Sequence, residues 1–322
     1  MCSRIHLDTA FAFRQQALVV SQDYKLSDLV RLRSLAPSAV RSRSARVNLA
    51  SMNRQHPTDA NTPVLAYCGI DVAFAKRKSL PIAVCTRLNG RLRALPLRNR
   101  DLRPPPRGSG NRAALDPAVL MAFANEAADY IQWVQNHFAV SIARIAIDAP
   151  RDYAPEGRRR RAECAMDALG ISCFATPSRS AFEHHRSRAL AHLASGGAEN
   201  RLPNANQWWM LVGFALFQRL QNDFDCIEVF PNAIVRALDP AVAHKSTKNG
   251  YARQMDLLRI ATNIGGEELE IAAHGSRHDR LDAVLSAWVG SLAPAERVAH
   301  GDGGMDTIWS VPATVASAAS VA

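Results

Sequence analysis

Cysteine is scarce in this chain: its six cysteines form no CxxC pair and have no regular spacing. This argues against both a zinc ribbon and a secreted disulfide framework. Long apolar runs are also missing. The most apolar stretch, Trp208 to Phe217, is much shorter than the ~20 residues that a membrane-spanning helix needs. We therefore expect a soluble protein in a reduced, cytoplasmic setting.

Acidic residues are outnumbered by basic ones, 29 to 39, which gives a formal net charge of +10. A basic protein of this size most often binds a polyanion, so we expect nucleic acid, DNA or RNA, as the partner. The alternative is that about half of the excess positive charge simply belongs to a disordered arm. At 48% hydrophobic content the chain has enough apolar residues for a core, which indicates a globular protein.

Residues 1–63 hold many Arg and Ser residues, few acids and no sustained hydrophobic periodicity. They predict a basic, mostly disordered N-terminal arm. Arg14 interrupts the apolar stretch near the start, which argues against a cleaved signal peptide, whereas an Arg-rich transit sequence is compatible with the composition. A further alternative is that translation begins at Met52. Residues 64–312 then form one domain, and residues 313–322, rich in Ala, Val and Ser, a disordered tail.

Alternating and apolar runs indicate strands from residue 64 onward. Three of them, Val64–Ala73, Pro81–Thr86 and Leu92–Leu97, precede any helical pattern, and Asn89-Gly90 joins the second to the third. Asn-Gly between such runs is the strongest short-range hairpin signal. The three strands are therefore expected to form an antiparallel meander.

Helical patterns then alternate with two more strands. Asp116-Pro117 begins a helix that runs to about His137, since Asp suits the N-cap and Pro the first turn. Ile142–Ile147 and Asp225–Phe230 are the fourth and fifth strands. Further helices are expected at 157–168, 181–193, 207–221, after Pro231, at 251–263 and at 277–292, with one short ordered segment at 302–312. This order predicts an α/β fold with a ribonuclease H-like mixed five-stranded sheet: strands 1-2-3 are antiparallel, strands 4 and 5 run parallel to strand 1, and helices flank the sheet, with a helical insertion between strands 4 and 5.

Four carboxylates are predicted to meet at one edge of this sheet. Asp71 directly follows the first strand, Asp148 follows the fourth, and Asp279 and Asp282 lie one turn apart on the last helix. Neighbouring parallel strands end at the same edge of a sheet, where α/β proteins bind ligands. No Lys or Arg is obviously placed to neutralise Asp71, and four converging acids would repel one another without cations. The alternative for each acid taken singly is an ordinary surface carboxylate.

Hard oxygen ligands at this density suit Mg²⁺ or Mn²⁺. Two such ions can activate a water and stabilise the leaving oxygen in phosphodiester hydrolysis. We therefore predict a two-ion site in which Asp71, Asp148, Asp279 and Asp282 are both the metal ligands and the catalytic residues.

Other polar residues are candidates for supporting roles, each with a structural alternative. Glu228 lies in the apolar fifth strand, either beside the metal site or paired with an Arg. Lys245 precedes a helix, where its ammonium would meet a phosphate or developing negative charge, or is solvated. The run Arg158–Arg161 offers one or two phosphate contacts, and His278 is either a proton shuttle near the metals or an ordinary surface residue. Trp208-Trp209 is expected to pack in the core rather than stack on bases.

These pieces together resemble a known family, domain of unknown function 429 (DUF429), whose members are predicted nucleases of the ribonuclease H fold. The resemblance covers roughly Val64 to Pro312. It rests on Gly69–Ala73 with Lys76, Ile147–Pro150, Arg161–Cys164, Glu228–Pro231, His244–Lys248 with Gly250 and Arg253, and His278–Ala283. It implies a ribonuclease H-like core with acids arranged as in Holliday-junction resolvases, although those enzymes usually carry Glu where this chain has Asp148. Because Lys76 and Arg161 match the family, the resemblance also implies that they either support the metal ligands or contact a substrate phosphate.

The leading hypothesis is a metal-dependent nuclease. One alternative is an ATPase or kinase of the actin-like superfamily, which shares this core. Two features count against it: Val72-Ala73 and Ala149-Pro150 stand where phosphate-binding turns normally have Gly, and there is one copy of the core. The other alternative is a nucleic-acid-binding scaffold without catalysis. Unused converging carboxylates would destabilise such a scaffold.

Overall fold

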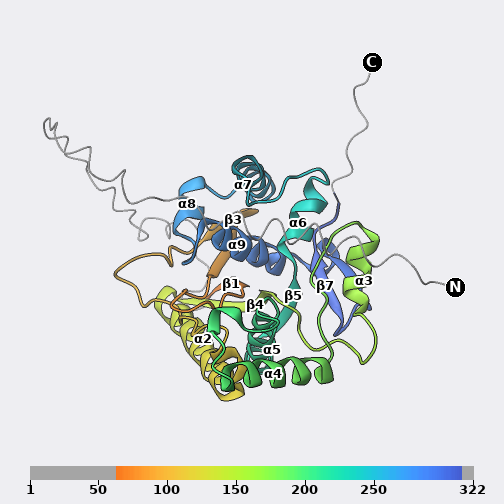
Figure 1. The fold of residues 1–322 in the computed structure, drawn as a ribbon. Coiled ribbons are helices and arrows are strands. Elements are labelled where there is room, and N and C mark those ends of the chain that lie inside the picture. Colours follow the sequence, from red (N-terminus) through yellow and green to blue (C-terminus); the bar gives the residue numbers. More distant parts are fainter. Residues whose placement is uncertain (1–62, 314–322) are drawn as a thin grey trace, which may run out of the picture. The chain divides into compact units, whose positions relative to one another are not determined.

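A mixed sheet of seven strands forms the centre of the computed structural model, which describes residues 63–313 (Figure 1). The sheet order is β3-β2-β1-β4-β5-β7-β6. Its strands are β1 (Val64–Asp71), β2 (Ile82–Leu88), β3 (Arg91–Ala94), β4 (Val140–Asp148), β5 (Asp225–Val229), β6 (Val298–Gly301) and β7 (Thr307–Ser310). The predicted N-terminal arm and most of the predicted tail lie outside the described residues.

The antiparallel meander β1-β2-β3 confirms the sequence prediction. β2 pairs with both β1 and β3, and Leu88 pairs with Arg91, which leaves a two-residue turn. Asn89 and Gly90 both have positive φ, 51° and 76°. Such a turn matches the twist of the two strands and favours Asn-Gly.

β4 and β5 are parallel to β1, as the sequence predicts, but the sheet continues beyond them. The prediction of five strands was therefore wrong. β7 adds parallel to β5, and β6 pairs antiparallel with β7, so the short segment expected at 302–312 is half of a hairpin. Each of these strands has four residues. Such short edge strands carry little of the apolar alternation by which strands are recognised.

Eight α-helices in the described residues cover both faces of the sheet (Figure 1). Three of them follow β4 and form the predicted insertion before β5. The helices are α2 (Pro117–Phe138), α3 (Arg161–Ala168), α4 (Arg179–Ala194), α5 (Trp208–Leu220), α6 (Pro231–Leu238), α7 (Lys248–Thr262), α8 (Gly266–Ile271) and α9 (Arg277–Ser291). Helix α8 was not expected, because Gly265-Gly266 resembles a helix break. None of the described helices is long and apolar enough to cross a membrane.

The alternation of side chains along the strands divides the interior into two cores. On β4, Ile145 and Ile147 belong to the core beneath α2 and α5, whereas Ala146 belongs to the core beneath α9. Successive residues of a strand point to opposite faces, so a fully apolar strand fills both cores. The apolar run of β4 is therefore explained by burial on both faces.

Helix α9 lies unusually close to β1 at Gly69. A Cβ atom on Gly69 would stand 2.0 Å from the carbonyl oxygen of Ala283 and 2.3 Å from the nitrogen of Ala287. No side chain fits this contact, and the two residues that face it are themselves small. This close packing brings the first turns of α9 next to the carboxyl end of β1.

Candidate metal centre

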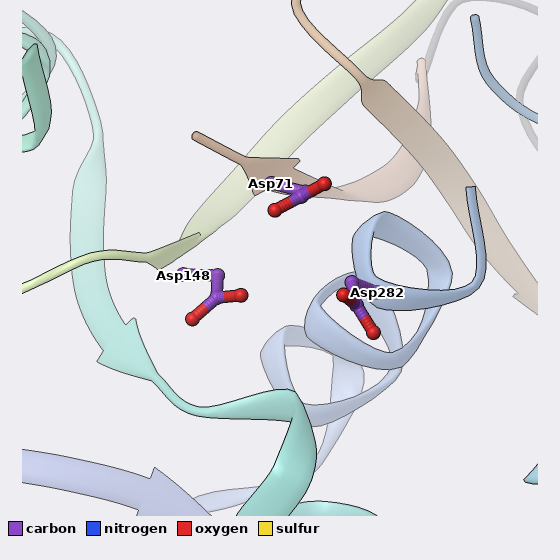
Figure 2. A group of neighbouring side chains, drawn as sticks. All are labelled: Asp71, Asp148 and Asp282. Carbon is purple, nitrogen blue, oxygen red and sulfur yellow. The ribbon is translucent and has the colours of Figure 1, made fainter. Parts of the chain in front are cut away.

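The carboxyl ends of β1 and β4 place two acids side by side. The two strands are parallel neighbours, and Asp71 is in register with Asp148. Helix α9 adds Asp282, and one carboxylate oxygen from each of the three residues lies within 4.8 Å of the others. Figure 2 shows the three carboxylates converging on one space from two strand ends and a helix. We refer to Asp71, Asp148 and Asp282 as the acid triad.

Burial and mutual repulsion make this group electrostatically costly. Burial, followed by the negative charge of Asp279, raises the pKa of Asp71 from 3.8 to about 7, and the charges of Lys245 and Lys78 oppose the shift. Burial also raises the pKa of Asp148 well above its ordinary value, with a further contribution from Asp71. An opposite charge is what would return such carboxyls to their ionised form. The triad therefore favours a cation in its centre.

Lys245 supplies one such charge within the protein. Its ammonium forms an ion pair with Asp282 and lowers the pKa of Asp71 and of Asp148. The expectation that no Lys or Arg is placed to meet Asp71 was therefore wrong. Lys245 reaches the triad from the loop before α7, 37 residues away in the chain from Asp282. Sequence spacing gives no information about such a contact.

The loop that carries Lys245 is shaped by the residues around it. The Thr247 hydroxyl accepts a hydrogen bond of 3.0 Å from the Gly250 amide and so caps α7. A Cβ on Gly250 would approach the carbonyl oxygen of His244 to 2.2 Å, so Gly is required there. The cap also explains why α7 begins at Lys248, three residues before the predicted start.

Asp279 lies close to the triad but is not part of it. Its carboxylate accepts a 2.7 Å hydrogen bond from the Ser276 amide, which completes a capping box at the start of α9. The same carboxylate accepts a 3.0 Å hydrogen bond from the Lys78 ammonium. Burial acts to raise the pKa of Asp279, but these bonds outweigh burial and lower it. The structure thus brings together three of the four predicted ligands, and Lys78 is a neighbour that the sequence analysis missed.

A family model described as a protein of unknown function (DUF429) matches residues 69–303, which is more than half of the chain. The chain belongs to the DUF429 family. All three triad residues and Lys245 fall within the matched segment. Comparison with curated proteins and with solved structures gave no match.

In this DUF429 chain Glu228 pairs with an arginine, which is the structural alternative considered for it. The Arg160 guanidinium donates two hydrogen bonds to the Glu228 carboxylate, at 2.9 and 2.7 Å, and the Arg151 amide donates a third at 2.8 Å. Both side chains of the ion pair are only 4% exposed. The charge of Glu228 nonetheless helps to raise the pKa of Asp148, although less than burial and Asp71 do. Glu228 therefore affects the triad only through its negative charge, which acts on Asp148.

Within the run Arg158–Arg161, the residue that packs near the triad is Arg160, and not Arg161 as expected. Arg160 is buried, whereas Arg161 is exposed and its backbone amide donates to the Asp306 carboxylate at 2.6 Å. Arg160 lies at the N-cap position of α3, with extended backbone. Sequence patterns locate a helix start only to within a few residues, so they did not distinguish these two arginines.

The remaining two candidates occupy separate surroundings. Lys76 is exposed and lines a pocket with Gly110 and Glu199, to which no residue of the triad contributes. His278 packs against Tyr251, with 5.4 Å between ring centroids. Burial, Arg277 and Lys245 lower the pKa of His278, so the neutral imidazole is favoured beside the site.

The triad has the donors and the size that a hard divalent cation requires. All its ligand atoms are carboxylate oxygens, and they lie within 4.8 Å of one another. Oxygens on opposite sides of a Mg²⁺ ion are about 4.2 Å apart, because each bond is about 2.1 Å long. Once all three carboxylates are ionised, their charge exceeds what the Lys245 ammonium offsets. The residues of the DUF429 chain therefore fit Mg²⁺ or Mn²⁺.

Proposed function

We propose that this protein is a metal-dependent nuclease that hydrolyses phosphodiester bonds of DNA or RNA with two Mg²⁺ or Mn²⁺ ions. The observation that carries the proposal is the convergence of Asp71, Asp148 and Asp282 within 4.8 Å, at the carboxyl ends of adjacent parallel strands. Ions held there would supply an activated water and would stabilise charge on the leaving oxygen.

The strand arrangement supports a ribonuclease H-like core as part of the proposal. Strands β3-β2-β1-β4-β5 occur in this order, the first three antiparallel and the last two parallel to β1. The hairpin β6-β7 is then an addition to that core at the β5 edge. The net charge of +10 is consistent with a polyanionic substrate.

The side chains divide the work around this site. Asp71, Asp148 and Asp282 bind the ions. Asp279 fixes the start of α9 and holds Lys78 beside the site. Lys245 offsets part of the negative charge of the triad through its ion pair with Asp282 and, if bound ions took its place, would be near enough to meet a substrate phosphate.

A non-catalytic nucleic-acid-binding scaffold is the second candidate, and Lys245 is the observation in its favour. The ion pair with Asp282 relieves part of the repulsion that would otherwise count against unused acids. An actin-like ATPase has no comparable support: the described chain forms one sheet, with Val72-Ala73 directly after Asp71.

Cleavage assays on single-stranded, duplex and branched DNA and RNA, with Mg²⁺ or Mn²⁺, test the proposal. We expect metal-dependent cleavage by the wild type. Asp71→Asn and Asp282→Asn should each slow it by more than about 100-fold, since even residues behind the ligands typically cost 10–100-fold. Asp256→Asn, at an exposed acid on α7, is the matched control and should cut normally.

The outcomes separate the candidates. If the wild type cuts none of these substrates in either metal, the nuclease proposal fails. Equal binding of nucleic acid by the wild type and both triad variants would then favour the scaffold. Metal-dependent release of phosphate from ATP, lost in Asp71→Asn, would favour the ATPase.

A further inference from the structure

A small cavity of about 60 Å³ opens directly beside the acid triad. The residues that line it include Asp148, Pro150, Phe174, Trp209 and Met210. The cavity has room for about four to six water molecules, since each needs about 10–15 Å³. One ring system therefore suits it better than a base pair.

Three aromatic residues line this cavity, Phe174, Trp209 and Phe230, and the first two lie next to each other. Phe174, in the segment between α3 and α4, is 59% exposed, and its ring centroid lies 6.3 Å from that of Trp209, with the planes at 70°. The Trp209 indole donates a 2.9 Å hydrogen bond to the carbonyl oxygen of Asn206, which fixes its orientation. Trp208 is fully buried as the sequence predicts, but Trp209 is only partly buried. An exposed aromatic beside a candidate active site indicates a surface for binding.

Apart from Asp148 of the triad, the charged residues that line the cavity already have partners within the protein. Arg160 is bonded to Glu228, and the Glu163 carboxylate accepts a 2.9 Å hydrogen bond from the Thr176 amide. No guanidinium is thus left for a phosphate inside this cavity, because Arg160 is the one that lines it. The remaining surface is mainly apolar and aromatic, which selects a flat, uncharged ring.

We propose that this cavity receives one unpaired nucleobase of the substrate strand, held against Phe174 and Trp209, while an adjacent phosphate lies at the acid triad. The inference rests on the proposed nuclease function and deepens it. Bases held within a duplex are stacked and paired, so they do not enter such a cavity without being unstacked. The substrate class is accordingly single-stranded nucleic acid, or an unpaired segment of a larger structure.

Oligonucleotide binding measured by fluorescence anisotropy in EDTA, in the Asp71→Asn background, tests the cavity without any cleavage. Phe174→Ala should bind labelled oligo-dT and oligo-U about ten-fold or more weakly, the loss that one stacked base produces. Phe174→Trp should bind like the parent, and Phe174→Leu like Phe174→Ala, because Leu keeps the apolar volume but lacks the ring face. Ile260→Ala, at a 73% exposed residue of α7, is the control and should bind like the parent.

Abasic substitution locates the base itself. Removing the base at one position of the strand should weaken binding about ten-fold in the parent, with no further loss in Phe174→Ala. Full-strength binding by Phe174→Ala, indifference to abasic sites at every position, or equal binding of a fully paired duplex would each overturn the inference.

The proposed function and this inference fail separately. Base-dependent binding without any metal-dependent cleavage leaves the cavity assignment standing and removes the nuclease. Metal-dependent cleavage that is unaffected by abasic sites would support the nuclease and overturn the cavity assignment.

Discussion

Glu228 and Arg160 form an ion pair that is almost closed off from solvent, one strand away from the triad. Removing one member of such a pair strongly destabilises the fold, because the other member remains as an uncompensated buried charge. We predict that Glu228→Gln lowers the free energy of unfolding by about 3–5 kcal/mol. Asp256→Asn, which breaks the exposed Arg259–Asp256 pair, should cost less than about 1 kcal/mol. Urea denaturation of both variants measures the difference.

The same variant separates a structural role of Glu228 from a metal-binding role. If Glu228 supports the fold alone, Mn²⁺ should raise the melting temperature of Glu228→Gln by about as much as that of the wild type. Loss of the Mn²⁺ response in a variant that still folds would instead place Glu228 among the ligands.

At the residue scale the sequence could identify acids by their position but not their partners. Asp71, Asp148 and Asp282 follow from strand ends and from the edge of an apolar helical stripe. Ser276 lies three residues before Asp279, and this S-x-x-D spacing at a helix start could have identified a capping box. The contact between Lys245 and Asp282 depends on tertiary packing, so local pattern contains no sign of it.

At the element scale the position of α9 depends on the missing side chain of Gly69. We predict that Gly69→Ala lowers the free energy of unfolding by about 3 kcal/mol or more, at the upper end of overpacking costs, since the added carbon meets backbone atoms of α9. Relief of the clash moves α9, and Asp282 with it, so the Mn²⁺ response should also weaken. Thermal and urea denaturation measure both effects.

Gly266→Ala is the matched control for this change. Gly266 is the first residue of α8, and a Cβ there would meet no atom within 4 Å. We expect it to be neutral or to stabilise by up to about 1 kcal/mol, the usual effect of Ala for Gly where the backbone permits it. Equal stability of the two variants would contradict the role given to the contact between α9 and β1.

The elements that sequence could predict are those with a strong local signal. The Asn89-Gly90 turn and the Asp116 cap are both found as predicted; the Asp116 side chain accepts a 2.9 Å hydrogen bond from the Ala118 amide. The hairpin β6-β7 was not predicted because Val298–Gly301 is short and partly exposed. The hairpin joins the sheet only through the long-range pairing of β7 with β5. Local propensity therefore explains the meander better than it explains the far edge of the sheet.

For the whole molecule, the raised pKa values of Asp71 and Asp148 predict an unusual dependence of stability on pH. In the folded, metal-free protein Asp71 keeps its proton up to about pH 7, whereas in the unfolded chain it loses it near 3.8. The folded state then binds more protons between these values, so the contribution of Asp71 to the free energy of unfolding falls as pH rises from about 4 to about 7 and levels off above that. Asp148, whose pKa is also raised, adds to the fall. Asp71→Asn should lack the Asp71 part of this fall. Urea denaturation in EDTA across this range measures it, and parallel curves for the two proteins would contradict the assignment.

Divalent ions should reverse this trend. Because Mn²⁺ binds ionised carboxylates and must displace their protons, its stabilising effect should be greater at about pH 8 than at about pH 5.5. Melting temperatures with Mn²⁺ and with EDTA at both pH values test this. An equal shift at both, or one retained by Asp282→Asn, would mean that the ion binds elsewhere.

The ion pair between Lys245 and Asp282 has a consequence for how such a protein would be loaded with metal. The Lys245 ammonium already offsets part of the negative charge that an ion would neutralise, so the chain can fold before any metal is present. If the triad takes up a divalent ion as proposed, loading would be a cation exchange, in which the three carboxylates would hold the ion and the Lys245 ammonium would be released. The affinity for the ion would then be the difference between its attraction to the carboxylates and the attraction of Lys245 to them, and the released Lys245 would be free to contact a bound phosphate.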